Sequence, residues 1–527
     1  MKKFARVLAV IMIVVFAVTA FAACGKGDKN SDGSTSKVKI IEINLTEEEY
    51  AFGVDKSQPE LLAKVNAFIA EIKENGKFDE ICNRYFGDGT PIAVKSAELD
   101  TSKDQLVVAT NAAFEPFEYT PNGGEDYYGI DMEIAAALAE YLGQELVIQN
   151  MKFESVCLSV GQHQCDIAMA GLTIKPSRKE YVTFTDSYYS ASQKLIVTSD
   201  NTDFDACKTK EDVEKILNTY NKDVKIGVQA GTTAQFYLEG DPKWDPPFPG
   251  FAVTCTPYEN GALAVQDLVN GGVQAVVLDS APAECITKAI NSMGFNDKIN
   301  RFMEVLVEQK GYVKVVEGLK NTLKIAVLGL VIGIVIGTLI AIVRVLPKYR
   351  VLPRFLNTIC SGYVALFRGT PMVVQLLVFY YVVLPLLEIR LPSITVSIIV
   401  FGLNSGAYIS EIMRSGIQSV DYGQMEGGRS VGLSFSTTML KIVIPQAIKN
   451  ILPTLGNEFI VLIKETSIVS FVGAADLYVA FNYIGSNNYE FMVPYLTMAL
   501  IYIVLVCVIT LLVKIMERSL KKSDRRN

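Results

Sequence analysis

The chain of 527 residues has few of the residues that enzymes and metal proteins commonly use. It contains one histidine, His163, in the polar stretch 161–164, and its nine cysteines include no C-x-x-C pair. A metal site of the usual kind is therefore not supported. We interpret His163 as a solvated residue at a helix end rather than as a catalytic base. The Lys and Arg residues form no basic stripe with interleaved aromatics, so we expect no nucleic-acid partner.

The chain also lacks a phosphate-binding loop of the form G-x-x-x-x-G-K-[ST]. Because that loop holds the phosphates of ATP, any ATP hydrolysis on which this chain depends is expected on a separate polypeptide. We expect no bound cofactor.

The composition that remains is mixed. Hydrophobic residues make up 50% of the chain, charged residues make up 20%, and the net charge is −7. This composition is too apolar for an ordinary soluble enzyme. It indicates a water-soluble part joined to a membrane part.

The N-terminus has the pattern of a secretory signal. A positively charged start precedes the apolar run 7–23, which ends in small residues directly before Cys24. A cysteine at that place resembles a lipobox, in which Cys24 would be acylated and become the first residue of the mature protein. An uncleaved anchor helix is the alternative. We predict a signal at 1–24 and a flexible tether at 25–37, and both alternatives place the next domain outside the cytoplasm.

Residues 104–302 alternate between apolar strands and amphipathic helices, which predicts α/β layers with parallel strands. The expected elements are a helix at 131–141 and strands at 106–109, 167–170, 195–197, 225–228 and 275–278. Short motifs in this body resemble the polar amino acid group of bilobed periplasmic binding proteins, type II. These motifs are Thr110–Tyr119, Gly129–Asp131, Asp166–Arg178, Phe184–Tyr189 and Gly231–Thr233.

Residues 38–92 resemble the C-terminal end of the same binding proteins, although here they come first. The elements expected in them are strands at 38–43 and 50–54, an amphipathic helix at 60–76 and a short helix ending at Gly87. The body at 104–302 stops without a comparable ending. We therefore predict a circularly permuted domain with 93–103 as the joint between the old termini. A remnant of a deleted tandem domain is the alternative.

The resemblance implies an amino-acid site between the lobes. Its residues are Asn111, Phe114, Phe153, Gly171, Thr173, Arg178, Thr233 and Asp279. Arg178 would pair its planar guanidinium with the ligand carboxylate. Asp279 would bind the ammonium, and the two phenylalanines would cover the aliphatic part. Asn111 and Gln229 stand where relatives often carry charged residues, so we expect a neutral polar amino acid such as glutamine. Basic amino acids remain open. The lobes would close by a hinge near the strands 38–43 and 195–197.

Five apolar spans follow a connector at 303–324, and we expect them to form a membrane domain at 325–516. The spans are about 325–343, 371–387, 393–412, 452–472 and 492–515. Lys and Arg gather in the loops after the first and third spans and in the tail 517–527, whereas 473–491 has none. The positive-inside rule therefore places the binding domain outside the cell and the C-terminus in the cytoplasm.

The polar stretch 423–446, between the third and fourth spans, is expected to form two short helices in the cytoplasm. It resembles the loop by which permeases of ATP-binding-cassette importers dock their ATPase, and the stretches 367–371 and 404–414 resemble the same permeases. The matching loop residues are Glu426, Gly432, Ile442 and Pro445, and Gly427, next to Glu426, is expected to belong to the same ATPase-coupling loop.

Two glycines of this loop, Gly427 and Gly428, stand where the family usually has alanines. Each glycine inside a helix costs about 1 kcal/mol relative to alanine. We therefore expect a loop helix that depends on its ATPase for rigidity.

The whole sequence thus predicts an importer subunit, not an enzyme, that dimerises through its membrane domain and recruits a cytoplasmic ATPase. Two other protein classes use the same ligand-binding fold. A ligand-gated channel would need a filter of the TVGYG kind, which is absent from the sequence. A sensor would need a cytoplasmic output domain, where we find a short basic tail. A dehydratase would need a general acid or base, and none is among the named site residues.

Overall fold

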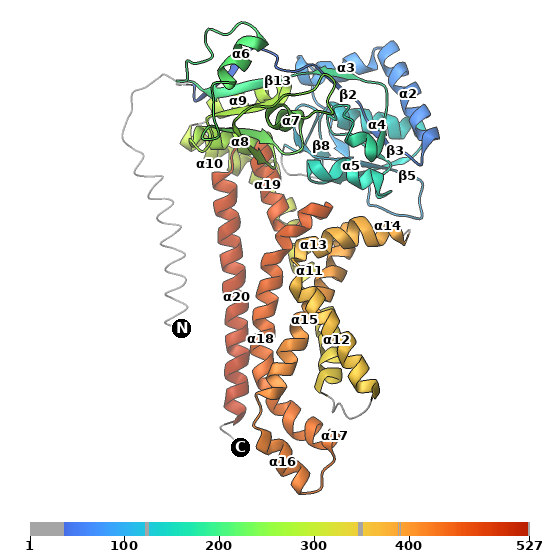
Figure 1. Cartoon of the computed structure of the whole chain (residues 1–527), viewed down its shortest axis with the longest axis vertical. Helices are drawn as coiled ribbons and strands as arrows, with labels where there is room; N and C mark the ends of the chain where they lie inside the picture. Colours follow the sequence, from blue (N-terminus) through green and yellow to red (C-terminus); the bar gives the residue numbers. More distant parts are fainter. Residues whose placement is uncertain are drawn as a thin grey trace.

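Two five-stranded sheets and the helices around them form one end of the molecule in the computed structural model. Long helices form the other end (Figure 1). Cys24, the predicted signal and most of the predicted tether lie outside the described residues. The structure describes residues 36–121, 126–292, 294–345, 351–387, 389 and 391–524.

The first sheet forms lobe 1, in the order β11-β3-β10-β5-β9. Its centre is parallel, since β5 pairs with β9 and β10, whereas β3 runs antiparallel to β10 and β11. Its strands are β3 Gly53–Asp55, β5 Gln105–Thr110, β9 Glu145–Asn150, β10 Ile167–Ala168 and β11 Val182–Phe184. Its helices are α2 Pro59–Glu74, α3 Lys77–Phe86, α4 Ile130–Leu142 and α5 Phe153–Gly161.

The second sheet forms lobe 2, in the order β1-β13-β16-β14-β15. Here β14 pairs in parallel with β15 and β16, and β13 is antiparallel to β1 and β16. The strands are β1 Val38–Ile41, β13 Gln193–Thr198, β14 Lys225–Gln229, β15 Thr254–Tyr258 and β16 Ala275–Asp279. The helices are α6 Lys210–Leu217, α7 Thr233–Glu239, α8 Gly261–Val269 and α9 Ser280–Ser292. The short pairs are β2 Glu48–Tyr50 with β12 Tyr189–Ala191, β4 Val94–Lys95 with β8 Asp126–Tyr127, and β6 Ala113–Phe114 with β7 Glu118–Tyr119.

The N-terminal stretch takes part in both lobes. It supplies β1 to lobe 2, then crosses and supplies β3, α2 and α3 to lobe 1. The predicted apolar face of α2 is buried in the core of lobe 1. A second crossing lies between β12 and β13. A hinge was expected near β1 and β13, but both strands pair within lobe 2. The crossings lie just beyond them, at 42–47 and at Ser192.

Six helices make up most of the helical domain below the lobes (Figure 1). They are α11 Tyr312–Val345, α12 Val351–Gly369, α13 Met372–Val378, α15 Ser393–Gln418, α18 Ile444–Glu465 and α20 Met492–Asp524. Among the described residues, α11, α15 and α20 are long and apolar enough to cross a membrane. A fourth candidate is α12 taken together with the helical stretch 372–386, which is bent from it by 106°. Helix α18 packs between α15 and α20 but falls outside this set.

The second predicted span covers only part of the fourth candidate. The stretch expected as a basic loop contains α12, which carries Arg354 and Arg368 within one helix. The expected span 371–387 is the arm that bends away after Gly369. The apolar residues of α12 are interrupted by arginines, so the sequence has no long apolar run here from which a membrane span could be predicted.

Close packing of α11 on α15 follows the predicted small-residue face of α11. Gly329, Gly333 and Gly337 are buried. A Cβ added at Gly333 would lie 2.8 Å from the Ser405 side chain, and one at Gly337 would lie 2.8 Å from Ile409. Larger residues would therefore push the two helices apart.

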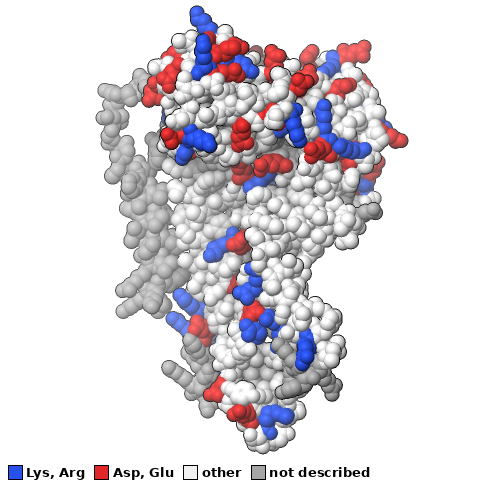
Figure 2. All heavy atoms as spheres, in the orientation of Figure 1, with Lys and Arg blue, Asp and Glu red and all other residues white. Residues whose placement is uncertain are grey.

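Charged side chains divide the visible surface into zones (Figure 2). They are dense on the two lobes, sparse over the middle of the molecule and present again toward the other end. At that far end lie α16 Tyr422–Ser430 and α17 Phe435–Thr438, the two short helices expected in the stretch 423–446 (Figure 1).

Candidate functional site

The eight predicted ligand residues meet where the two lobes face each other. Several follow the carboxyl ends of parallel strands, the edge at which α/β sheets bind ligands. Asn111 comes directly after β5, Gly171 follows β10 closely, and Asp279 is the last residue of β16. Lobe 1 supplies Asn111, Phe114, Phe153, Gly171, Thr173 and Arg178, and lobe 2 supplies Thr233 and Asp279.

Arg178 bridges the lobes. One guanidinium nitrogen donates to the Thr173 carbonyl at 2.8 Å, and the other donates to the Gly231 carbonyl in lobe 2 at 3.0 Å. The guanidinium carbon lies 5.0 Å from the ring centroid of Phe153. The only cation among the predicted residues therefore stands at the junction, flanked by an aromatic ring, where it can meet a carboxylate.

Asp279 lies opposite, in a buried acidic pocket. The Tyr50 hydroxyl of lobe 1 donates to its carboxylate. Burial, and next the charge of Glu48, raise the pKa of Asp279 to about 7. Glu48 accepts from the hydroxyls of Thr46 at 2.6 Å and Thr173 at 2.7 Å. Glu48 and Tyr50 lie on β2, directly after the first crossing between the lobes. Their place beside that crossing is the signal by which the sequence could have identified them as site residues.

A further carboxyl, Glu118, has both oxygens buried with no hydrogen-bond partner within the part of the chain that the structure describes. It pairs directly with Phe114 in the β6–β7 ladder, so both side chains share one face. Burial, and then Asp131 and Asp279, raise the pKa of Glu118 well above its usual value. The site is thus more acidic than its predicted residues indicate.

Asp131 supports the site from below. Its carboxylate accepts from the Gly171 amide at 2.9 Å and from the Tyr188 hydroxyl at 2.6 Å. Burial raises the pKa of Asp131 to about 7. Gly171 has φ +53°, and a Cβ there would lie 2.8 Å from the Phe114 ring, so glycine is required. Asp131 therefore fixes the turn that brings Gly171 into the site.

Direct contacts join the remaining residues across the junction. Gln229 in lobe 2 lies 3.5 Å from the Asn111 side-chain oxygen, and Asn111 donates to the Met151 carbonyl at 2.7 Å. The hydroxyls of Thr233 and Thr173 lie 3.3 Å apart. The lobes are therefore closed on each other in this structure.

The helical domain touches both lobes through α19 Leu477–Asn488 and the residues after it. Toward lobe 1, Asn488 donates to the Pro121 carbonyl at 3.0 Å and the Tyr489 hydroxyl donates to Glu115 at 2.5 Å. Toward lobe 2, the hydrogen bonds are Tyr478 to Glu259 at 2.9 Å and Asn260 to Ser486 at 2.9 Å. One short segment thus contacts lobe 1 and lobe 2 together.

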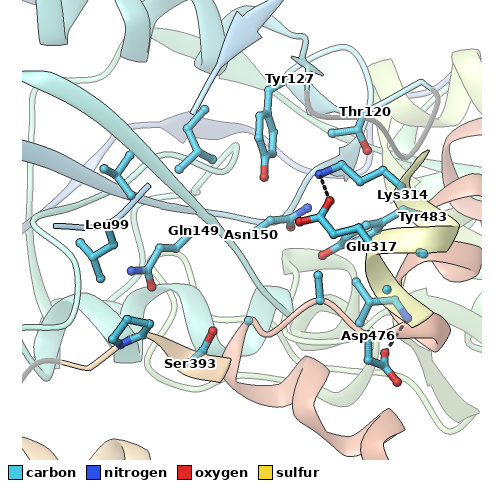
Figure 3. Close-up of a pocket in the computed structure, with 18 of the residues that line it drawn as sticks. Leu99, Thr120, Tyr127, Gln149, Asn150, Lys314, Glu317, Ser393, Asp476 and Tyr483 are labelled. Atoms are coloured by element: carbon cyan, nitrogen blue, oxygen red, sulfur yellow. Dashed lines mark hydrogen bonds and ion pairs between the residues drawn. The ribbon is translucent and has the colours of Figure 1, made fainter. Parts of the chain in front are cut away.

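A cavity of about 240 Å³ lies between lobe 1 and the helical domain (Figure 3). Its polar lining includes Tyr127, Gln149 and Asn150 from lobe 1 and Lys314, Glu317, Ser393, Asp476 and Tyr483 from the helical domain. Lys314 and Glu317 form an ion pair at 3.3 Å. A smaller cavity of about 20 Å³ is lined by Asn111 on one side and Tyr478 and Asn482 on the other. Polar space therefore adjoins the lobe junction on its helical side.

The predicted coupling loop presents an exposed surface. Glu426 and Gly427 lie on α16 and are exposed, Gly432 has φ +89°, and Pro445 lies in the first turn of α18. Three large apolar side chains around them are strongly exposed: Tyr422 at 72%, Val431 at 78% and Leu440 at 64%. Such exposure at the end of a helical hairpin favours a protein contact.

Comparisons with known proteins divide the chain within the first part of α11. The family model described as bacterial extracellular solute-binding proteins, family 3, matches residues 106–315. The model described as binding-protein-dependent transport system inner membrane component matches residues 329–522.

Individual relatives are permease proteins of amino acid transport systems. The arginine transport system permease protein ArtQ of Bacillus subtilis (strain 168) is 37% identical over 210 residues, which is 40% of this chain and 94% of the relative. The putative glutamine transport system permease protein GlnP of Rickettsia prowazekii (strain Madrid E) is 39% identical over 206 residues, or 39% of this chain and 92% of the relative.

Two solved structures each match less than half of the chain. A crystal structure of an amino acid ABC transporter with histidines has 39% identity and a TM-score of 0.38, and covers 41% of this chain and 97% of that one. An ancestral amino-acid-binding protein, a precursor of cyclohexadienyl dehydratase, has 31% identity and a TM-score of 0.30, with 41% and 78% covered.

Proposed function

The chain belongs to the family of binding-protein-dependent transport system inner membrane components, and on this premise we propose that it imports an amino acid captured by its own binding domain. It is a multi-pass membrane permease with a fused solute-binding domain. The observation that carries the proposal is that two family models, one for each task, match consecutive parts of one chain. The relatives named for arginine and glutamine transport support an amino acid as the cargo.

The ligand proposed for the lobe junction is an α-amino acid with a polar side chain. Arg178 would receive its carboxylate and Asp279 its ammonium, since these opposite charges stand on facing lobes. Glutamine, the expected neutral ligand, has a carboxylate for Arg178 and an ammonium for Asp279, and its side chain adds no further charge. The additional buried carboxyls of Glu48 and Glu118 favour a second candidate, a basic amino acid such as arginine, whose side chain brings the cation that they lack.

We also propose that the binding domain is circularly permuted, with 38–92 as its displaced ending and 93–103 as the joint. Support comes from β1 and β3, which pair inside the two sheets, and from the family match, which begins only at residue 106. The alternative of an unused remnant does not account for a segment whose apolar residues are buried in both lobes.

For the membrane domain we propose five spans: α11, α12, α15, α18 and α20. An odd number puts the lobes and the C-terminus on opposite sides of the membrane. The basic residues of the predicted loops and tail favour the cytoplasm for the C-terminus and the outside for the lobes. Lipidation of Cys24 would add an anchor on the outer side.

Two partners follow. A separate ATP-binding subunit would dock on α16 and α17, where apolar side chains are exposed. A second copy of this chain would pair through the helical domain, as the resemblance to importer permeases implies.

Calorimetry of the full chain in lipid nanodiscs tests the function, with L-arginine and L-glutamine as probes. The wild-type chain is expected to bind at least one of them. Arg178→Ala should weaken that binding about 100-fold, because it removes one partner of a buried charge pair. Lys179→Ala, which removes an exposed cation from the same segment, should leave the Kd within about twofold. Binding of neither probe would contradict the proposal.

A further inference from the structure

Lys175 is a buried lysine that reaches from one lobe into the other. It lies in the lobe 1 turn between Thr173 and Arg178, and its ammonium is 3.3 Å from the Asp241 carboxylate of lobe 2. The same nitrogen lies 2.6 Å from the ring centroid of Phe236 and 5.6 Å from that of Trp244. Two aromatic faces and one carboxylate therefore surround a single cation.

The receiving side is built within lobe 2. Trp244 stacks on Phe248 with ring centroids 4.8 Å apart and on Phe236 at 6.5 Å. Trp244 and Phe248 belong to the buried core of lobe 2, and Phe236 packs against that core. These contacts involve no residue of lobe 1, so the rings pack on one another within lobe 2.

The cation is held only while the lobes are together. Burial lowers the pKa of Lys175 to about 8, and pairing with Asp241 opposes that shift. A buried ammonium is costly without a counter-charge, and both the counter-charge and the rings come from the opposite lobe. Separation of the lobes would remove both the counter-charge and the rings from the ammonium.

The turn also connects Lys175 to the ligand site. The backbone N–H groups of Arg178 and Lys179 both donate to the Lys175 carbonyl at 3.1 Å. Fixing Lys175 against lobe 2 therefore fixes the start of the short helix that carries Arg178.

We propose that Lys175 is a positioning residue that clasps lobe 1 to the Phe236–Asp241–Trp244 cage of lobe 2 when the site closes over its ligand. This clasp rests on the proposed function. It stabilises the closed form, and so the ligand affinity, without touching the ligand.

Trp244 makes the clasp observable, because it is the only tryptophan in the sequence. The experiment uses the full chain in nanodiscs, with L-arginine and L-glutamine added separately. Calorimetry gives the Kd, and the emission of Trp244 reports entry of Lys175 into the cage. The variants are Lys175→Ala, Asp241→Asn and the matched control Lys179→Ala.

Lys175→Ala and Asp241→Asn are expected to raise the Kd at least tenfold. The control should stay within twofold of wild type. Addition of ligand should change Trp244 emission in wild type and in Lys179→Ala, and should leave it unchanged in Lys175→Ala. Should Lys175→Ala fail to fold, Lys175→Gln keeps a polar chain without the charge and serves the same test.

Wild-type binding combined with an unaltered Kd in Lys175→Ala and Asp241→Asn would overturn the clasp alone. The same holds if Lys175→Ala keeps the full emission change. Failure of the wild-type chain to bind either amino acid would overturn both the clasp and the proposed function.

Discussion

At the scale of single residues, the lobe junction gathers several buried carboxyls around one predicted cation. Asp131, Asp279, Glu48 and Glu118 are all buried, and Arg178 is the one cation among the predicted ligand residues. A carboxyl removed from water favours its protonated form. The stability of the binding domain should therefore depend on pH.

The raised pKa of Asp131 sets the direction of this pH dependence of stability. Its pKa is raised from the ordinary value near 4 to about 7, so the folded domain holds the proton more tightly than the unfolded chain does. The stability from this group is fully present below pH about 4 and is lost as pH rises to about 7. The slope is at most about 1.4 kcal/mol per pH unit. Thermal unfolding of Asp131→Asn should show a weaker pH dependence than wild type.

The surface variant Asp223→Asn is the control for this measurement, because Asp223 is exposed in lobe 2. It should follow the wild-type pH profile. A profile of Asp131→Asn that coincides with wild type between pH 4 and 7 would contradict the assignment. Asp279, with a pKa also near 7, contributes in the same window, so part of the dependence should survive.

At the scale of elements, the two adjacent glycines of α16 have different surroundings. A Cβ added at Gly428 would lie 2.5 Å from the Thr438 methyl group, so glycine allows α16 to pack on α17. At Gly427, no described atom lies within 4 Å of an added Cβ. From the sequence alone, the two glycines are expected to have the same effect on α16, because helix propensity does not depend on a neighbouring helix.

Alanine at the two positions should therefore act in opposite directions. Gly427→Ala is expected to stabilise α16 by about 1 kcal/mol and to slow hydrogen exchange of its amides. Gly428→Ala should speed exchange, because the methyl group separates α16 from α17. The pair forms its own control, since both variants make the same chemical change. Equal exchange rates in both would show that α17 does not constrain α16.

Helices with a regular apolar periodicity could be predicted from the sequence. Residues whose roles depend on contacts with distant parts of the chain could not. The expected helices at 60–76 and 131–141 match α2 and α4 closely, because each has a regular apolar face. Helix α12 was hidden by its arginines. Lys175 and Tyr50 were missed because their roles depend on residues of the other lobe, far away in sequence. Long-range pairing of this kind leaves no local pattern.

At the scale of the whole molecule, the segment around α19 joins the binding domain to the permease. It hydrogen-bonds to both lobes in their closed arrangement, and Tyr489 and Phe491 pack into a core cluster of lobe 2. If the lobes separated as rigid bodies, this segment could not keep all of these contacts. Closure of the lobes and docking on the permease are therefore expected to favour each other.

Removal of a single hydroxyl from this segment tests that coupling. The Tyr489 hydroxyl donates to Glu115 of lobe 1, a largely buried carboxyl whose pKa is raised by burial and which this hydrogen bond helps to keep ionised. Tyr489→Phe leaves Glu115 without that donor, at a cost of about 1–3 kcal/mol to docking. In nanodiscs that also contain the ATP-binding subunit, amino-acid stimulation of ATP hydrolysis should fall at least fivefold. The Kd for the amino acid should rise by a smaller factor, because the ligand residues are intact.

Tyr495→Phe is the matched control, since the Tyr495 hydroxyl donates to Asn482 within the helical domain. Full stimulation in Tyr489→Phe, or an equal loss in Tyr495→Phe, would show that contact between α19 and lobe 1 does not transmit closure.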